Sequence, residues 1–274
     1  MLQISRLFVY PVKSLGGISV SSALLTDRGF QHDRRWMLVN EQNIFMTQRE
    51  YPQMALLRTN IAENGISIFH MDDIHERITI PFCTASGIRL TVKVWNDYCE
   101  AIFVDPQIDV WLSRKLNVTC RLVYMPDDSL RKVDPVYAVE QNNITSLSDG
   151  YPILLISQSS LDDLNSRLES PIPMNRFRPN IVLAGANPYE EDEMAEFMIR
   201  GIQFFGVKLC ARCSIPTINQ ETLEKSKEPT KTLATYRQKD HKILFGQNVL
   251  YSSGGVSLKV ADRVEITRRK EREL

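Results

Sequence analysis

This sequence lacks a second cysteine pair to accompany its one closely spaced pair, Cys210-Ala-Arg-Cys213. Structural zinc takes four ligands, which usually come from two such pairs, so this motif supplies half a zinc site at best. The other cysteines, Cys83, Cys99 and Cys120, are scattered and make the total of five odd. These features argue against a zinc knuckle and predict a reduced cytosolic protein whose thiols remain free.

The sequence also lacks an excess of charge of either sign, because 33 lysines and arginines balance 33 aspartates and glutamates. Zero net charge gives no general attraction to nucleic acids or membranes, so any anion site must be local. No apolar run approaches the roughly 20 residues that span a bilayer, and residues 1–6 show no sign of a cleaved leader. We therefore expect a cytoplasmic protein with no nucleic-acid or membrane partner.

Short β-prone runs dominate the first 125 residues. Two of them, residues 54–61 and 66–70, are separated by Asn64-Gly65, which is the pattern of a tight hairpin. One helix interrupts the strands, because Asp105 can cap it, Pro106 suits its first position, and apolar residues follow at helical spacing. The sequence thus predicts an N-terminal β domain over residues 1–125.

The polar stretch 127–143 is the best domain boundary in the chain. Beyond it, strands are predicted at residues 153–157, 180–184, 199–207, 248–251 and 264–267. A helix is predicted to begin at Ser160 with a capping-box-like motif, and residues 217–229 form a long polar connection of a kind that is often functional. We predict a second domain over residues 126–267, a charged tail over 268–274, and a β-rich α+β class for the whole chain.

Four basic clusters lie at strand ends or turns: Pro11-Val-Lys-Ser14, Asp33-Arg-Arg-Trp36, Thr47-Gln-Arg49 and Phe177-Arg-Pro-Asn180. Any one of them alone is more often solvated, or covers apolar surface with its side-chain stem. Lys-Ser and Thr-x-Arg, however, combine a cation with a short hydroxyl donor, which is what a buried phosphate needs from a loop. The cysteine pair has a similar plain interpretation, since free cysteine often only fills space.

Taken in order, these segments resemble the family of MOSC proteins that includes the mitochondrial amidoxime-reducing component and its bacterial relatives. The series continues through Asn165-Ser-Arg-Leu168, Cys210-Ala-Arg-Cys213, Glu228-Pro229, Tyr236-Arg237 and Phe245-Gly-Gln247. The resemblance runs nearly the whole chain. It implies an N-terminal MOSC-associated β domain followed by a MOSC β-barrel, with a molybdopterin-type molybdenum cofactor between them.

The resemblance also implies site residues. Cys213 corresponds to the thiolate ligand of molybdenum, and a soft thiolate suits such a metal. Arg212 beside it is expected to favour the deprotonated sulfur, whereas Cys210 is expected only to pack. Asp149 corresponds to an acidic position that orients the pterin or manages protons near the metal, so we count it with Cys213 as catalytic.

The remaining predicted site residues bind the cofactor. Its terminal phosphate carries roughly two negative charges, which cannot be buried uncompensated. By family correspondence the cofactor-binding residues are Lys13, Ser14, Arg34, Arg178 and Asn180, with Arg49 as a weaker member and with Arg212 and Thr217 near the metal ligand. Both domains contribute to this set, so Lys13, Arg34 and Arg178 are expected to converge in one cleft that also holds Cys213.

The chain departs from the family pattern near the expected substrate. Pro216-Thr217-Ile218-Asn219 stands where relatives have Thr-Thr-Val-Asp, Met194 stands where many have tryptophan, and Gly150-Tyr151 replaces two hydroxyl residues. The four-cysteine run of a plant-type [2Fe–2S] domain, which some bacterial relatives carry, is not found in these 274 residues. Electrons are therefore expected from a separate flavin or iron–sulfur protein.

The function that the resemblance implies is a molybdenum-dependent oxidoreductase that reduces the N–O bond of N-hydroxylated compounds. One alternative is sulfur handling, with a persulfide on Cys213, although 274 residues hold no pyridoxal-phosphate domain. A second alternative is a non-catalytic carrier of the molybdenum cofactor. A recombinant sample can lose such a cofactor, so metal and pterin analysis has to accompany any assay.

Overall fold

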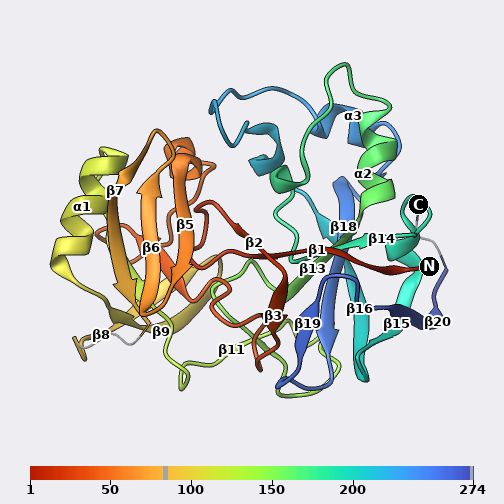
Figure 1. Ribbon diagram of the computed structural model, residues 1–274, viewed down its shortest axis with the longest axis horizontal. Coiled ribbons are helices and arrows are strands. Elements are labelled where there is room, and N and C mark those ends of the chain that lie inside the picture. Colours follow the sequence, from red (N-terminus) through yellow and green to blue (C-terminus); the bar gives the residue numbers. More distant parts are fainter. Residues whose placement is uncertain (83–85, 272–273) are drawn as a thin grey trace.

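The computed structural model describes residues 1–82, 86–271 and 274 (Figure 1). Strands dominate it and helices are few and short, which confirms the predicted β-rich α+β class. Cys83, one of the thiols expected to be free, lies outside the described residues, as do residues 272–273 of the predicted tail. No helix in the described part of the chain is long and apolar enough to cross a membrane.

The larger part of the molecule is built on a nine-stranded sheet. Its strands lie in the order β2 (Ile18–Val20), β1 (Gln3–Val9), β14 (Ile181–Ala184), β13 (Ile153–Ser157), β18 (Lys242–Tyr251), β16 (Ile202–Ala211), β15 (Met194–Ile199) and β20 (Val264–Arg269), with β17 (Gln238–Lys239) paired to β18. Only β13 and β14 run parallel, because α2 (Gln158–Asn165) lies in the connection between them. A bridge between Gln3 and Arg263 brings the β20 end of the sheet back to β1, so the sheet curls toward a barrel.

Residues 36–124 form a separate, smaller part, on the left in Figure 1. It contains a four-stranded sheet, β4 (Trp36–Val39), β10 (Arg121–Tyr124), β9 (Asp97–Phe103) and β8 (Arg89–Val94), and a three-stranded sheet, β5 (Leu57–Ala62), β6 (Gly65–His70) and β7 (Asp73–Pro81). The helix α1 (Pro106–Leu116) packs here and buries Ile108, Leu112 and Leu116.

Several short elements lie outside these sheets. They are β3 (Ser22–Leu24) paired with β19 (Ser257–Lys259), β11 (Arg131–Lys132) paired with β12 (Ile144–Thr145), α3 (Thr230–Ala234), and the 3₁₀ turns η1 (Pro52–Leu56), η2 (Met174–Arg176), η3 (Glu190–Glu193) and η4 (Ile215–Thr217). The β3–β19 pair links the start of the chain to its end.

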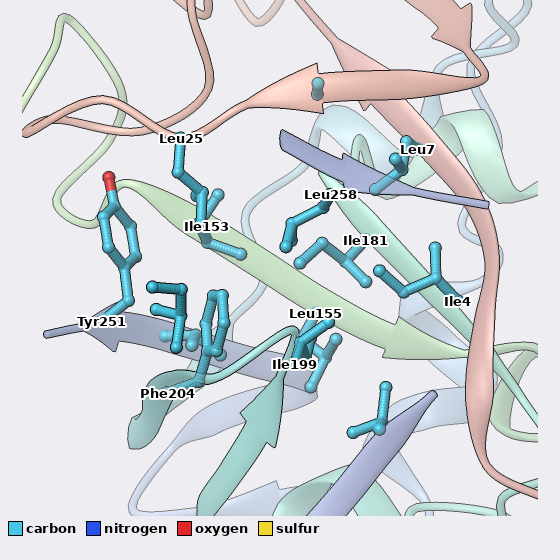
Figure 2. Packing of buried hydrophobic residues seen from close by; sticks show 14 of the residues in the cluster. Ile4, Leu7, Leu25, Ile153, Leu155, Ile181, Ile199, Phe204, Tyr251 and Leu258 are labelled. Atoms are coloured by element: carbon cyan, nitrogen blue, oxygen red, sulfur yellow. The ribbon is translucent and has the colours of Figure 1, made fainter. Parts of the chain in front are cut away.

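The core of the large sheet includes residues from both ends of the chain. In Figure 2, Leu25 points toward Ile153, while Leu7 and Ile4 lie near Ile181, all from one buried cluster. Each of these side chains is fully buried. The first 30 residues therefore contribute to the core of the second half of the chain, although the sequence pattern groups them with the first half.

Two local predictions are confirmed. Asp105 accepts hydrogen bonds from the backbone N–H groups of Gln107 and Ile108 and so caps α1, with Pro106 at its first position. The hairpin between β5 and β6 also forms where it was predicted, but Gly65 already lies in β6. A Cβ on Gly65 would lie 2.1 Å from the carbonyl oxygen of Ile80, so this glycine permits the close approach of β7.

Three local predictions need correction. The strand predicted at 199–207 is two strands, because Arg200 (φ 50°) and Gly201 (φ 79°) form a turn between β15 and β16 that suits a tight hairpin. The cap of α2 is Ser157, which accepts from the backbone N–H of Ser160, so the helix begins before Ser160. Finally, β20 extends to Arg269, two residues into the predicted tail.

Candidate cofactor-binding site

A cleft lies between the two parts of the chain. The predicted site residues in its wall are Lys13, Ser14, Arg34, Arg49, Asp149, Arg178, Asn180, Arg212 and Cys213, and Cys210 lines it as well. The structure thus brings together the basic segments of the first part and the cysteine segment of the second, as the order of the motifs predicted. Thr217 is the exception, since its hydroxyl donates to the carbonyl of Ser214 within η4 and the residue does not line the cleft.

Three residues in the wall have left-handed backbone conformations. They are Ser14 (φ 67°), Arg34 (φ 49°) and Arg178 (φ 57°). Residues other than glycine rarely adopt positive φ, and such conformations are retained where surrounding structure fixes them, often at functional sites. Because all three line one cleft, these backbone conformations indicate that the fold positions their side chains toward that cleft.

Tyr10, which the sequence analysis overlooked, organises two of the cations. The guanidinium groups of Arg34 and Arg178 lie 4.2 and 4.4 Å from the centre of its ring. Burial raises the pKa of Tyr10 to about 12 although both arginines oppose the change, so the ring stays neutral. Asp33, itself buried, accepts from the Tyr10 backbone N–H and pairs with Arg34, which fixes the group. The position of Tyr10 directly before the Pro11-Val-Lys-Ser14 motif is the feature of the sequence that could have identified it.

Lys13 and Asp149, which come from the two predicted domains, form an ion pair. The Lys13 ammonium donates to the Asp149 carboxylate at 2.7 Å and to the carbonyl of Leu147 at 2.9 Å. Burial lowers the pKa of Lys13, against the opposing attraction of Asp149. Desolvation would raise the pKa of Asp149, but 70% of its side chain is exposed, so Lys13 and a hydrogen bond from Trp95 hold that pKa well below its usual range. Asp149 is therefore ionised at neutral pH.

Arg178, like Arg49, contacts only an aromatic ring through its guanidinium among the described residues. Among the described residues its guanidinium makes no ion pair and no hydrogen bond, and its one recorded contact is the Tyr10 ring. Burial, together with the nearby Arg34, lowers the pKa of Arg178 to about 10. Across the cleft, the hydroxyl of Thr47 is buried without a partner in the described structure. Unmatched donors of this kind suit an anion.

The cysteine segment differs from expectation in the role of Arg212. Its guanidinium donates to the sulfur of Cys210 at 3.1 Å and to the carbonyl of Phe177 at 2.7 Å, and no contact to Cys213 is recorded. Residues two apart on a strand share one face, and the backbone N–H of Arg212 still pairs with Ile243 in the ladder. Cys213 follows the end of β16 and lines the same cleft. The direct sulfur partner of Arg212 is therefore Cys210, which does more than fill space, and an effect of Arg212 on Cys213 stays a prediction.

Asn180 lines the cleft, but its amide is engaged elsewhere. Its oxygen accepts from the backbone N–H of Leu154 and its nitrogen donates to the carbonyl of Phe8. These bonds join β1 to β13 next to the cleft. Asn180 thus stabilises the junction on which Arg178 is carried.

A buried pair of glutamines joins the two walls behind the cleft. The amides of Gln48 and Gln220 donate to each other at 3.1 and 3.0 Å, and both residues are almost completely buried. Gln48 also donates to the carbonyl of Ser14, and Arg58 donates to the carbonyl of Gln220. The pair therefore connects the Ser14 turn to the segment that follows Cys213, a link that separate motifs did not reveal.

The cleft as a whole is cationic and carries one soft ligand. Five basic side chains line it, Lys13, Arg34, Arg49, Arg178 and Arg212, against the single exposed carboxylate of Asp149. Such a surface attracts anions although the chain has no net charge. The thiol of Cys213, in the same wall, can act as a ligand to a thiophilic metal.

Comparison with known proteins assigns both parts of the chain. The MOSC N-terminal beta barrel domain matches residues 1–119, and the MOSC domain matches residues 142–265. Mitochondrial amidoxime-reducing component 1 of Mus musculus is 32% identical over 246 residues, which cover 85% of this chain and 71% of that protein. Mitochondrial amidoxime reducing component 2 of Homo sapiens is 31% identical over 281 residues, which cover 95% of this chain and 82% of that protein.

Molybdenum cofactor sulfurases are similar to the same extent. The protein of Oryza sativa subsp. japonica is 31% identical over 264 residues, which cover 89% of this chain. The aligned region is 32% of that sulfurase, so the chain spans about a third of its length.

Proposed function

Since this chain belongs to the family of MOSC proteins, in which a MOSC N-terminal domain precedes a MOSC domain, we propose that it binds a molybdenum cofactor and reduces N-hydroxylated compounds. The reaction would convert an N–OH group and two electrons with two protons into N–H and water. The electrons would come from a separate flavin or iron–sulfur protein in the cytoplasm.

The observation that carries the proposal is the unmatched charge in the cleft. Arg178 has no anionic partner among the described residues, and the hydroxyl of Thr47 has none either. A molybdopterin ends in a phosphate with roughly two negative charges, and phosphate is matched best by arginine donors. The residues present therefore fit the group.

Different residues of the chain would hold the two ends of the cofactor. Ser14, Arg34 and Arg178 would bind the phosphate end, Lys13 would hold the Asp149 carboxylate in place, and Cys213 would supply a thiolate to the metal. When bound, the cofactor supplies two-electron redox chemistry at molybdenum. Arg49 would contribute charge at the rim of the cleft rather than a phosphate contact, since its guanidinium lies on the Trp95 ring.

Asp149 and Lys13 would manage charge next to the reacting group. The Asp149 carboxylate stays ionised and exposed, so it can accept N–H groups of a bound base. Lys13 holds its proton on Nζ between that carboxylate and the Leu147 carbonyl. Together they would orient a substrate by its nitrogen atoms and keep its N–O bond directed into the cleft.

Two other functions fit parts of the same picture. The similarity to molybdenum cofactor sulfurases favours sulfur transfer through a persulfide on Cys213 as the second candidate. A carrier that binds the cofactor without catalysis is the third. Mass spectrometry of the Cys213 peptide distinguishes the sulfur-transfer function, because a persulfide adds the mass of one sulfur atom.

The deciding experiment uses full-length protein made in a host that synthesises the cofactor. We expect molybdenum and pterin to copurify with it, and benzamidoxime to be reduced to benzamidine with a chemical electron donor. Cys213→Ser serves as the control that should lose this turnover. Bound metal without turnover would favour the carrier, and protein that never contains molybdenum or pterin would refute the proposal.

A further inference from the structure

One aromatic side chain at the edge of the cleft has no place in the cofactor site. Trp95 occupies the two-residue turn between β8 and β9, has a left-handed backbone (φ 57°), and leaves 39% of its surface exposed. A tryptophan combining positive φ with this exposure is unusual for a residue that serves only packing.

The contacts of Trp95 lead directly into the cleft. Its indole Nε1 donates to Oδ1 of Asp149 at 3.2 Å, and the guanidinium of Arg49 lies 4.2 Å from the indole centre. Both partners line the cleft. Phe45 packs against the indole, with 5.1 Å between the two ring centres. Trp95 therefore stands at the rim, beside the one exposed carboxylate of the site.

A single buried arginine fixes this arrangement. Arg131, 4% exposed, pairs with Asp97 at 2.8 Å, two residues beyond Trp95. The same guanidinium donates to the carbonyls of Ser148 at 2.6 Å and Asp149 at 2.9 Å. The hairpin tip and the Asp149 loop are thus held by one group, so indole and carboxylate are placed before any ligand arrives.

The chemistry of the rim fits a planar N–C–N group. Arg49 shows that the indole accepts such a cation, because a guanidinium has the same flat shape as an amidinium. Oδ2 of Asp149 receives no hydrogen bond from the described residues and can accept N–H donors. A flat amidine can therefore take the place of the Arg49 guanidinium on the indole ring and meet the carboxylate with its nitrogens.

We propose that Trp95 is a specificity-determining residue that selects planar amidine-type N-hydroxylated substrates through its indole, acting together with Asp149. The inference rests on the proposed function. It adds to it a recognition element supplied by the N-terminal part of the chain.

A binding test needs no turnover. Benzamidine, a planar amidine without an N–O bond, should quench the tryptophan fluorescence of the wild-type protein. Trp95→Ala should lose the quenching, whereas Trp111→Phe, a control on the distant helix α1, should keep it. Quenching that persists in Trp95→Ala with the wild-type midpoint would overturn the inference.

A kinetic test separates recognition from a merely structural role. With benzamidoxime we expect Trp95→Ala to raise KM about tenfold and to change kcat less than twofold, as loss of a stacking contact with the planar, uncharged amidoxime implies. With hydroxylamine, an N–O substrate that has no planar N–C–N group, kcat/KM should be unchanged. Trp95→Phe retains an aromatic ring but loses the hydrogen bond to Asp149, so its KM for benzamidoxime should lie between those of the wild type and Trp95→Ala. This variant keeps the test informative if the alanine variant folds poorly.

The outcomes distinguish the two proposals. Equal losses for benzamidoxime and hydroxylamine in Trp95→Ala would overturn the role of Trp95 while leaving the enzyme function intact. A wild-type protein that reduces neither substrate would refute the proposed function, and the benzamidine titration would then still decide whether Trp95 binds amidines.

Discussion

Replacing Arg178 by methionine should stabilise the cofactor-free protein and weaken cofactor binding at the same time. Its guanidinium is partly buried, points into the cleft and has no ion-pair partner among the described residues. Holding that charge costs free energy when the cleft contains only solvent. It stabilises a complex when a phosphate is present.

The size of the effect follows from the pKa. Burial lowers the pKa of Arg178 from 12.5 to about 10, which corresponds to at most ~3.5 kcal/mol at 1.4 kcal/mol per pKa unit. Partial exposure reduces this penalty, and loss of the contact with Tyr10 removes about 0.5–1 kcal/mol of favourable energy. We therefore expect Arg178→Met to raise the free energy of unfolding by about 1 kcal/mol.

The assay is urea unfolding of protein made in a host without the cofactor, followed by pterin analysis of protein from a competent host. Arg167→Met is the matched control, because Arg167 follows α2, pairs with Asp163, rests on the Tyr236 ring and lies outside the cleft. This control should change stability by less than ~0.5 kcal/mol and leave pterin content unchanged. Arg178→Met should retain at most a tenth of the wild-type pterin.

Two results would refute the reasoning. If Arg178→Met lowered the free energy of unfolding of the cofactor-free protein by more than ~1 kcal/mol, the side chain would be a structural support instead of an unmatched charge. If the variant kept a full complement of pterin, the phosphate would have to be bound elsewhere.

Three further predictions concern thiols, coupling and pH. Cys213→Ser should abolish metal-dependent turnover while Cys210→Ser keeps measurable activity, and equal loss in two folded variants would reassign the ligand. Gln48→Ala or Gln220→Ala leaves a buried amide unpaired, so each should lower the free energy of unfolding by about 1–3 kcal/mol, with the double variant well below additive in urea unfolding. Burial, against a hydrogen bond from a backbone N–H, raises the pKa of Asp109 to about 6. Its unfolded pKa is about 3.9, so stability should fall as pH rises from about 4 to 6. Asp109→Asn should abolish that fall, and identical pH profiles for variant and wild type would contradict the assignment.

Local signals in the sequence were sufficient for individual elements. The Asp105-Pro106 start of α1 and the hairpin near Gly65 depend on residues within a few positions of each other, so their physics is visible in a short window. The two-residue turn at Arg200 was missed because the apolar pattern runs through it without interruption. Only the pairing of β15 with β16 reveals it.

The site was predictable as a set but not as a geometry. Cations from both domains and one cysteine segment had to share a ligand, so their convergence followed from the motif order. The link between Trp95 and Asp149 joins residues 54 apart, and that between Gln48 and Gln220 joins residues 172 apart. A periodic pattern along the sequence does not reveal contacts between residues that are so far apart in the chain. The direction of the Arg212 side chain likewise depends on where β16 ends, which its neighbours in sequence do not determine.

The place of β1 in the large sheet has a consequence for how the protein is made. Gln3 pairs with Ala184, so at about 5–20 residues per second the partner of the first strand is synthesised roughly 10–40 s after it. During that interval β1 has only β2 to pair with, and its apolar residues Ile4 and Leu7 lack the core that they pack against in the finished protein. A fragment that begins at residue 126 would lack β1 and expose the edge of β14, so expression of the C-terminal half alone should give aggregation-prone protein unless residues 1–30 are supplied with it.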